Sequence, residues 1–276
     1  MLGKLLKQEF RATGRIMLPV FGALVVLSVL ANLSIRLLDS GVSDSGVLRF
    51  LAVFVIIVFV LGIFGALLVT LLLMVSRFYR NLLKDEGYLM HTLPVSVHGL
   101  VWSKLIVSLV WFIVTGLVIF LIVLLTGLIQ SGTSLSEFII MFPSWAEIKA
   151  VLLDQGIRSG DIVRFCAETV FLALLSVLVG CLHFYAAMAM GHMFNKDKIL
   201  LSIVFFVAIS FVLSLLTSVL GFRVTMSAEL AMSGGAETIL FFSRRLLLFS
   251  LSIQALQGAL LYFATTLSLR RGLNLA

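Results

Sequence analysis

Six long, predominantly apolar stretches of the chain contain no Asp, Glu, Lys or Arg. They cover residues 16–35, 50–76, 105–136, 169–195, 199–222 and 246–269. Each reaches the roughly 20 residues that a helix needs to cross about 30 Å of hydrocarbon. A transmembrane strand would alternate in polarity, and an open sheet would leave backbone groups unpaired in lipid. The pattern therefore predicts an all-α, polytopic membrane protein with six transmembrane helices.

The first 15 residues follow a different pattern. Apolar side chains gather on one face at helical spacing, and basic side chains gather on another. The apolar set is Leu2, Leu5, Leu6 and Phe10, and the basic set is Lys4, Lys7, Arg11 and Arg15. Such a pattern is typical of a helix that lies in the membrane interface, with basic residues toward the headgroups. We predict an interfacial amphipathic helix over 1–15; the alternative is a positively charged start to the first span.

The connecting segments predict smaller features. Segment 130–164 is the longest connection, and within it Ser144 is followed three residues later by Glu147. This spacing is that of a capping box, so we expect a short surface helix to begin after Pro143. Residues 195–198, with the sequence NKDK, predict a tight turn. Pro19 is expected in the first turn of the first span, where a missing N–H does little harm.

Composition and charge add an orientation. The chain has 276 residues, of which 61% are hydrophobic and 12% charged, against about 25% charged in soluble domains. Twelve of the 20 Lys and Arg, but only 4 of the 13 acids, fall on the side of the N-terminus. The positive-inside rule then predicts both ends in the cytoplasm. The net charge of +7 is explained by loops that face anionic lipid, not by nucleic acid. We predict a single transmembrane domain over 1–276.

Polar residues recur at helical spacing on the last two spans. They include Ser214, Thr217, Ser250, Gln254 and Gln257. In lipid such faces turn toward other helices, because close approach and side-chain hydrogen bonds drive association there. The face is therefore either a helix or subunit interface, or a wall of a substrate path.

Segment 77–104 is too long for a tight turn between the second and third spans. Its sequence is RFYRNLLKDEGYLMHTLPVSVHGLVWSK. The first ten residues can extend the second span as a helix, which Gly87 ends. Leu93 precedes Pro94 and is therefore disfavoured for helix. Ser96 can cap the helix that leads into the third span.

The order of residues in this segment resembles the membrane subunits of type-2 ABC exporters. The matching order is an acid and Gly, a short apolar run, Leu-Pro-Val-Ser, and a Lys that opens the next span. The residues that carry it are Asp85, Glu86, Gly87, Thr92, Leu93, Pro94, Val95, Ser96 and Lys104. The leading helix and six spans match as well, so the resemblance covers the whole chain. Tyr88 stands where the family commonly has Thr after the Gly.

The resemblance implies a permease subunit of an ATP-driven exporter in the bacterial cytoplasmic membrane. Residues 85–88 and 92–96 would then form a coupling helix that docks on an ABC ATPase subunit, which binds the ATP and Mg. A second permease, identical or related, would complete the transporter. The cargo is not specified: peptides, antimicrobials, lipids and drug-like molecules all remain open.

The sequence offers no chemistry of its own. It has no GxxxxGK[ST] motif for ATP, and we expect no bound metal or cofactor. His183 and His192 are nine residues apart and face opposite sides of one helix, so they cannot share a metal. A secondary transporter is one alternative, although no acid or strong base lies deep in a span; a non-catalytic regulatory membrane subunit is another.

Overall fold

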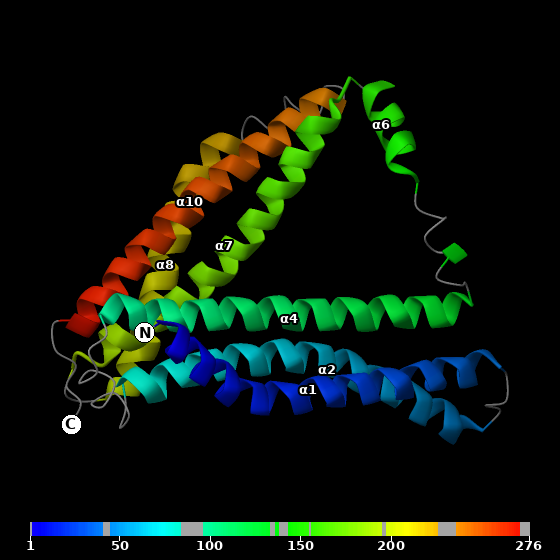
Figure 1. Cartoon of the computed structure of the whole chain (residues 1–276), viewed down its shortest axis with the longest axis horizontal. Coiled ribbons are helices and arrows are strands. Elements are labelled where there is room, and N and C mark those ends of the chain that lie inside the picture. The colour runs from blue at the N-terminus through cyan, green and yellow to red at the C-terminus, as the bar shows by residue number, and fades with distance from the viewer. Residues whose placement is uncertain are drawn as a thin grey trace. The chain divides into compact units, whose positions relative to one another are not determined.

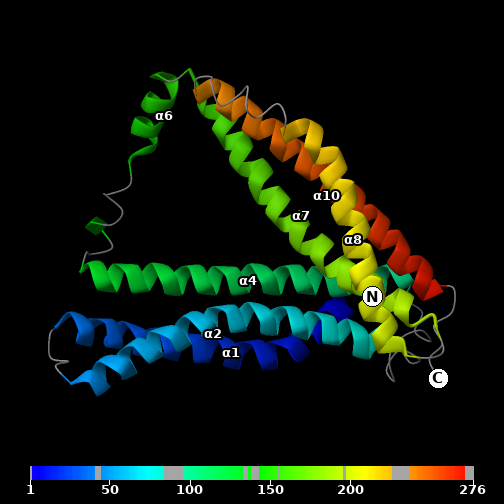
Figure 2. The same ribbon diagram turned by 180° about the vertical axis from the view of Figure 1, so that it is seen from behind.

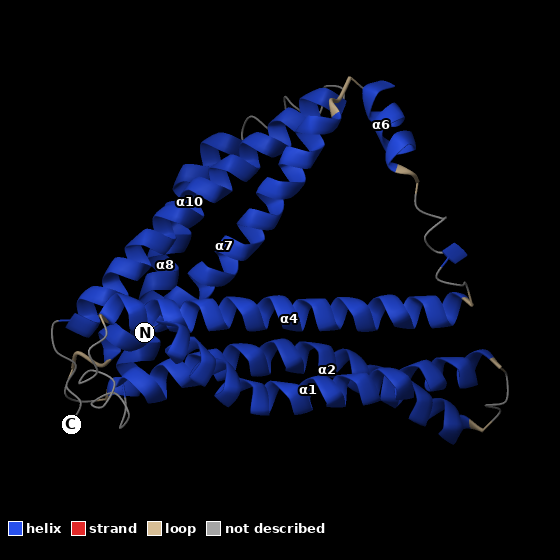
Figure 3. Ribbon diagram, in the orientation of Figure 1, coloured by secondary structure: helices blue, strands red, loops and turns tan. Residues whose placement is uncertain are grey.

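The computed structural model describes residues 2–40, 45–83, 96–132, 136–137, 143–154, 156–194, 197–225 and 236–270. Every regular element in these ranges is a helix (Figure 3). The helices are α1 (Leu2–Asp39), α2 (Gly46–Phe78), the π-helical turn η1 (Tyr79–Leu83), α4 (Val97–Ser131), α6 (Trp145–Asp154), α7 (Ser159–Gly191), α8 (Lys198–Thr225) and α10 (Ala236–Arg270).

Six of the described helices are long and apolar enough to span a membrane, as the sequence predicts. They are α1, α2 with η1, α4, α7, α8 and α10. Most of them extend several residues beyond the apolar runs. A helix can continue in this way because it satisfies its own backbone hydrogen bonds while long basic side chains reach toward the headgroups. The chain is thus an all-helical protein of the multi-pass membrane type.

The N-terminal segment differs from the expectation of a separate helix over 1–15. α1 runs without interruption from Leu2, so the amphipathic turns with Lys4 and Arg15 are its first part. Gly14 is the only helix-disfavouring residue at the junction, and one glycine costs about 1 kcal/mol, which is too little to end a long helix. Pro19 consequently lies inside α1 and not in a first turn. A proline there removes one backbone hydrogen bond and bends the helix, and the first turns of α1 run at an angle to the rest (Figure 1).

The helices gather in two compact units, whereas the sequence suggests one domain. The N-terminal unit comprises residues 1–76 and 106–142, and the C-terminal unit comprises residues 77–105 and 143–276. α2 and α4 each contribute to both. The prediction of a single permease domain stays a prediction.

The N-terminal unit packs α1 against α2 and α4. One buried cluster consists of Met17, Leu73, Met74, Val107 and Trp111, and a second consists of Leu24, Ala31, Phe59, Ala66 and Ile122. Polar side chains between the helices are paired: Trp111 donates to Thr13 Oγ1 at 2.7 Å, and the hydroxyls of Thr70 and Thr115 are 3.1 Å apart. Pairing of this kind is what a low-dielectric interior requires.

The C-terminal unit is built on α7, α8 and α10, which lie side by side in both views (Figures 1 and 2). Gly191 ends α7 so close to α8 that an added Cβ would lie 2.6 Å from the backbone nitrogen of Ser202. α6 precedes α7, and its predicted capping box is confirmed. The N–H of Ser144 donates to Glu147 Oε2 at 3.1 Å, and the N–H of Glu147 donates to Ser144 Oγ at 3.3 Å.

Candidate functional site

The structure describes the two ends of the predicted coupling segment but not its centre. Helical structure continues through α2 and η1 to Leu83, which confirms the predicted extension up to that residue. Ser96 caps α4, because its Oγ accepts the N–H of Gly99 at 3.3 Å. The remaining predicted contacts to an ATPase lie outside the described residues: Asp85, Glu86, Gly87, Tyr88, Thr92, Leu93, Pro94 and Val95.

The end that precedes this segment is anchored on α7. Phe78 stacks on Tyr185 with ring centroids 4.0 Å apart and an interplanar angle of 6°, and both side chains are fully buried. One residue further, Tyr79 meets His192 edge to face at 5.3 Å. Paired aromatic rings contribute beyond the area they bury. These ring contacts join the end of α2 to α7.

The end that follows the segment is anchored on α10. His98 lies in the first turn of α4, and its two ring nitrogens contact Tyr262 and Arg270, each at 2.6 Å. Arginine only donates, so His98 Nε2 accepts from Arg270. His98 is then the neutral tautomer with its proton on Nδ1, which donates to the Tyr262 hydroxyl. The start of α4 is thus tied to the last turns of α10.

His192 closes α7 just beyond the span. It is 3% exposed, and its Nδ1 donates to the carbonyl of Met188 at 2.9 Å. Burial lowers the pKa of His192 below its ordinary value of 6.5, and the charge of Lys198 lowers it too, whereas the bond to Met188 opposes the shift. The structure therefore favours a neutral His192 in the turn between α7 and α8.

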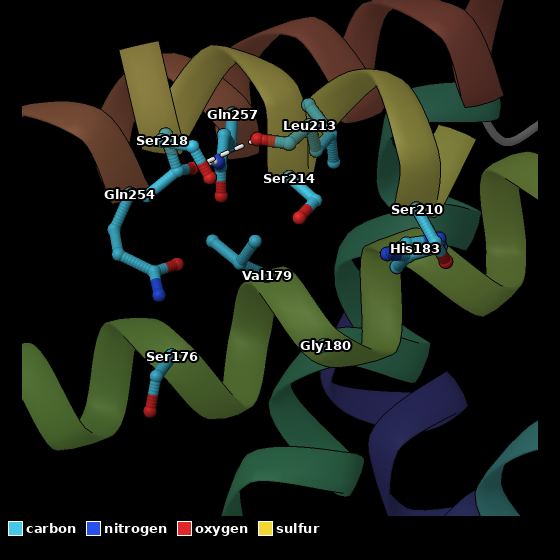
Figure 4. A pocket seen from close by; sticks show the side chains of 11 residues that line it. Ser176, Val179, Gly180, His183, Ser210, Leu213, Ser214, Ser218, Gln254 and Gln257 are labelled. Atoms are coloured by element: carbon cyan, nitrogen blue, oxygen red, sulfur yellow. Dashed lines mark hydrogen bonds between the residues drawn. The ribbon is translucent and has the colours of Figure 1, made fainter. Parts of the chain in front are cut away.

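A polar groove of about 450 Å³ lies between α7, α8 and α10 (Figure 4). It is lined by Ser176, Val179, Gly180, His183, Ser210, Leu213, Ser214, Thr217, Ser218, Gln254 and Gln257. None of these described residues carries a fixed charge. Four of the five residues predicted on the polar faces of the last two spans line it. Ser250 does not line it, and its hydroxyl donates to the carbonyl of Leu246 in its own helix.

Two hydrogen-bond chains fix the groove wall. Ser210 donates to the carbonyl of Phe206 at 2.8 Å, so its oxygen accepts at 3.1 Å from His183 Nε2. In the same way Thr217 donates to the carbonyl of Leu213 at 2.8 Å and accepts from Gln257 Nε2 at 3.0 Å. Each chain joins two helices, α7 to α8 in the first and α10 to α8 in the second.

The groove also holds a polar atom with no partner. Gln254 Oε1 is buried and makes no hydrogen bond among the described residues, and Figure 4 shows its amide directed into the groove. A buried, unpaired oxygen costs about 1–3 kcal/mol relative to a paired one. It is therefore the feature of this wall that helix packing leaves unexplained.

His183 and Ser176 were not among the predicted site residues. From the sequence His183 is interpreted as a packing residue, because a buried histidine near the centre of a span is more often hydrogen-bonded to a neighbouring helix than a proton relay. The available signal was their spacing: Ser176, Gly180 and His183 repeat at four and three residues, so they share one face of a helix. The structure turns this face toward the polar face of α8.

One ion pair ties the early turns of α7 to those of α10. Arg244 donates to both carboxylate oxygens of Glu168, at 3.0 and 3.2 Å, in a bidentate contact. Across the described ranges, no three His, Cys, Asp or Glu side chains stand close enough together to hold a metal ion. The groove and this ion pair are thus two polar features inside the candidate spans of the C-terminal unit.

No family model, curated protein or solved structure matches the chain.

Proposed function

We propose that the chain is the permease subunit of a type-2 ABC exporter in a bacterial cytoplasmic membrane, with both termini in the cytoplasm. It would work with separate ATPase subunits, which bind ATP and Mg, and with a second permease, identical or related. The observation that carries this proposal is the pair of anchored junctions at the ends of segment 77–104. A segment that receives force from a partner needs stiff connections to the spans.

The junctions supply such connections in two directions. Phe78 and Tyr185 link the end of α2 to α7, and His98 links the start of α4 to α10. α7 and α10 are also two of the three helices that line the polar groove. Closure of two ATPase subunits against residues 85–96 would therefore move the walls of a polar path within the membrane.

Two further features agree with an ATP-driven machine. The chain lacks a phosphate-binding GxxxxGK[ST] loop, so hydrolysis must come from a partner. The groove has no Asp, Glu, Lys or Arg among its described lining residues, whereas carriers driven by ions or protons usually place such a residue at mid-membrane.

The test is to purify the full chain in mild detergent and to identify subunits present in fixed proportion. We expect an ATP-hydrolysing subunit whose activity in liposomes rises when the chain is present. A purified chain that moves solute without such a companion would overturn the proposal.

A secondary transporter is the second candidate, and the observation that favours it is His183 in the groove wall. A proton-coupled carrier would acidify or alkalise liposomes that contain the chain alone. His183→Phe would abolish that pH change. If the chain is instead part of an ATP-driven exporter, the unaltered chain alone would cause no pH change.

A further inference from the structure

The polar groove lies at the middle of its helices. Gln254 is eighteen residues after Ala236 and sixteen before Arg270, the two ends of α10. At 1.5 Å per residue it is about 25 Å from either end. In α7, Ser176 is likewise close to the midpoint between Ser159 and Gly191. The groove therefore opens within the apolar zone, where little water is present to hydrogen-bond an unpaired polar group.

The hydrogen bonds of the wall leave acceptors facing the groove. His183 uses its Nε2 proton toward Ser210 and the carbonyl of Phe206, so Nδ1 keeps a free lone pair. Figure 4 shows one ring nitrogen turned to Ser210 and the other to the groove. Gln254 Oε1 is the second acceptor and is buried without a partner in the described part of the chain. The hydroxyls of Ser210 and Thr217 are already engaged.

A fitting ligand must therefore bring a hydrogen-bond donor. It must also be uncharged at that point, because the described lining residues offer no opposite charge, and an unpaired ion in a low-dielectric site is strongly disfavoured. Access through the hydrocarbon requires an apolar remainder. The groove volume of about 450 Å³ falls within the range of small-molecule sites.

We propose that this groove binds an uncharged amphipathic molecule through a hydroxyl or amide N–H donor, which pairs with Gln254 Oε1 and His183 Nδ1. The site stands on the geometry alone. Its assignment as the cargo site rests on the proposed function, which makes neutral hydrogen-bonding amphiphiles the substrate class of the transporter.

The experiment uses the full chain in nanodiscs with four photoactivatable probes of identical acyl chain. Diacylglycerol offers a hydroxyl, and a fatty primary amide offers an N–H. Methyl-capped diacylglycerol offers no donor, and phosphatidic acid adds charge. After irradiation, the labelled peptides are mapped by mass spectrometry. We expect the hydroxyl or the amide probe to label groove peptides of α7, α8 and α10 about three- to tenfold more than the methyl-capped probe, because one hydrogen bond separates them. Phosphatidic acid should also label less, because its charge has no partner among the described lining residues. Of the hydroxyl and amide probes, the one that labels more strongly identifies the preferred donor.

Two variants and one control sharpen the test. Gln254→Met keeps the length of the side chain and removes the amide, and His183→Phe keeps a ring without an acceptor. Each should reduce the preference for donor probes toward the level of the methyl-capped probe. Ser252→Ala changes an exposed serine of α10 whose hydroxyl bonds its own helix and does not line the groove, so it should leave the preference unchanged. Size-exclusion profiles identify any variant that fails to fold.

Three results would overturn the inference: equal labelling by all four probes, no labelling in the groove, or an unchanged preference in both variants. None of these measurements needs ATP or a partner subunit. If the chain is labelled specifically but no ATPase subunit co-purifies with it, the site stands and the proposed function is overturned. If an ATPase subunit co-purifies but the labelling is not specific, the proposed function stands and the site is overturned.

Discussion

At the scale of single residues, hydrogen bonds explain several polar side chains of the spans. Ser210 and Thr217 each donate to a carbonyl four residues earlier and use the remaining oxygen lone pair for a side chain from another helix. A serine or threonine in a helix thereby becomes a link between helices without leaving its own hydroxyl proton unpaired. Gln254 departs from this rule, which is why it marks the candidate ligand site.

His192 gives a prediction at this scale. Its pKa is lowered in the folded protein, so between that value and 6.5 the unfolded chain binds more protons than the folded one. The contribution of neutral His192 to the free energy of unfolding is then fully present above pH 6.5 and declines as the pH falls below 6.5. His192→Gln removes the titration, so the melting temperature should fall less between pH 7.5 and pH 5.5 than it does for the unaltered protein. Thermal unfolding in detergent measures this, and equal shifts in both proteins would contradict the assignment.

At the scale of elements, the turn between α7 and α8 depends on a missing side chain. Gly191 faces the backbone of Ser202, and an added Cβ would lie 2.6 Å from its nitrogen and 2.7 Å from its Cα. Real Cβ atoms do not approach a backbone so closely. The two helices must therefore separate if any other residue stands there.

Gly191→Ala should accordingly lower stability by about 1–3 kcal/mol, as overpacking does. The melting temperature should drop by several degrees. Gly116→Ala in α4 is the matched control, because a Cβ there meets nothing within 4 Å and alanine favours helix more than glycine does. If the melting temperature of Gly116→Ala falls as far as that of Gly191→Ala, helix glycines are sensitive in general. The close approach to Ser202 would then not explain the loss of stability.

The stack of Phe78 on Tyr185 gives a second prediction for elements. Tyr185→Leu removes the ring that joins α2 to α7, so cargo moved per ATP hydrolysed should fall several-fold while hydrolysis continues. Tyr185→Phe keeps the stack and should keep most of the coupling. Phe171→Leu changes an aromatic residue of the same helix that is 60% exposed and should behave like the unaltered protein. Loss of transport in all three variants would argue against a coupling role for the stack.

At the scale of the whole molecule, the proposed function depends on segment 77–104 meeting a soluble ATPase. Replacing both Asp85 and Glu86 by Lys should weaken ATPase binding and stimulation without affecting membrane insertion, because the charges lie outside the apolar runs. Asp154→Lys in α6 is a charge reversal at an exposed position and serves as control. Co-purification and ATP hydrolysis in liposomes measure the effect. Unchanged coupled transport in the double variant would place the contact elsewhere.

The sequence alone determined the number and kind of the candidate membrane-spanning elements. Charge-free apolar runs are sufficient to predict six spanning helices, because a bilayer leaves helices as the one solution for such runs. The caps at Ser96 and Ser144 were equally readable, since a cap depends on residues within one turn. The uninterrupted start of α1 could not be predicted, because the pattern of Lys4 and Arg15 fits both a separate helix and the first turns of a span.

Only the tertiary structure decided which polar residues meet. Ser176 and His183 are separated from Gln254 by about seventy residues, and no local pattern says that their helices lie together. Nor does the sequence show that Ser250 bonds back to its own helix while Gln257 reaches Thr217. The physical reason is that helix periodicity fixes which residues share a face of one helix, whereas the neighbour of that face is chosen by the packing of the entire unit.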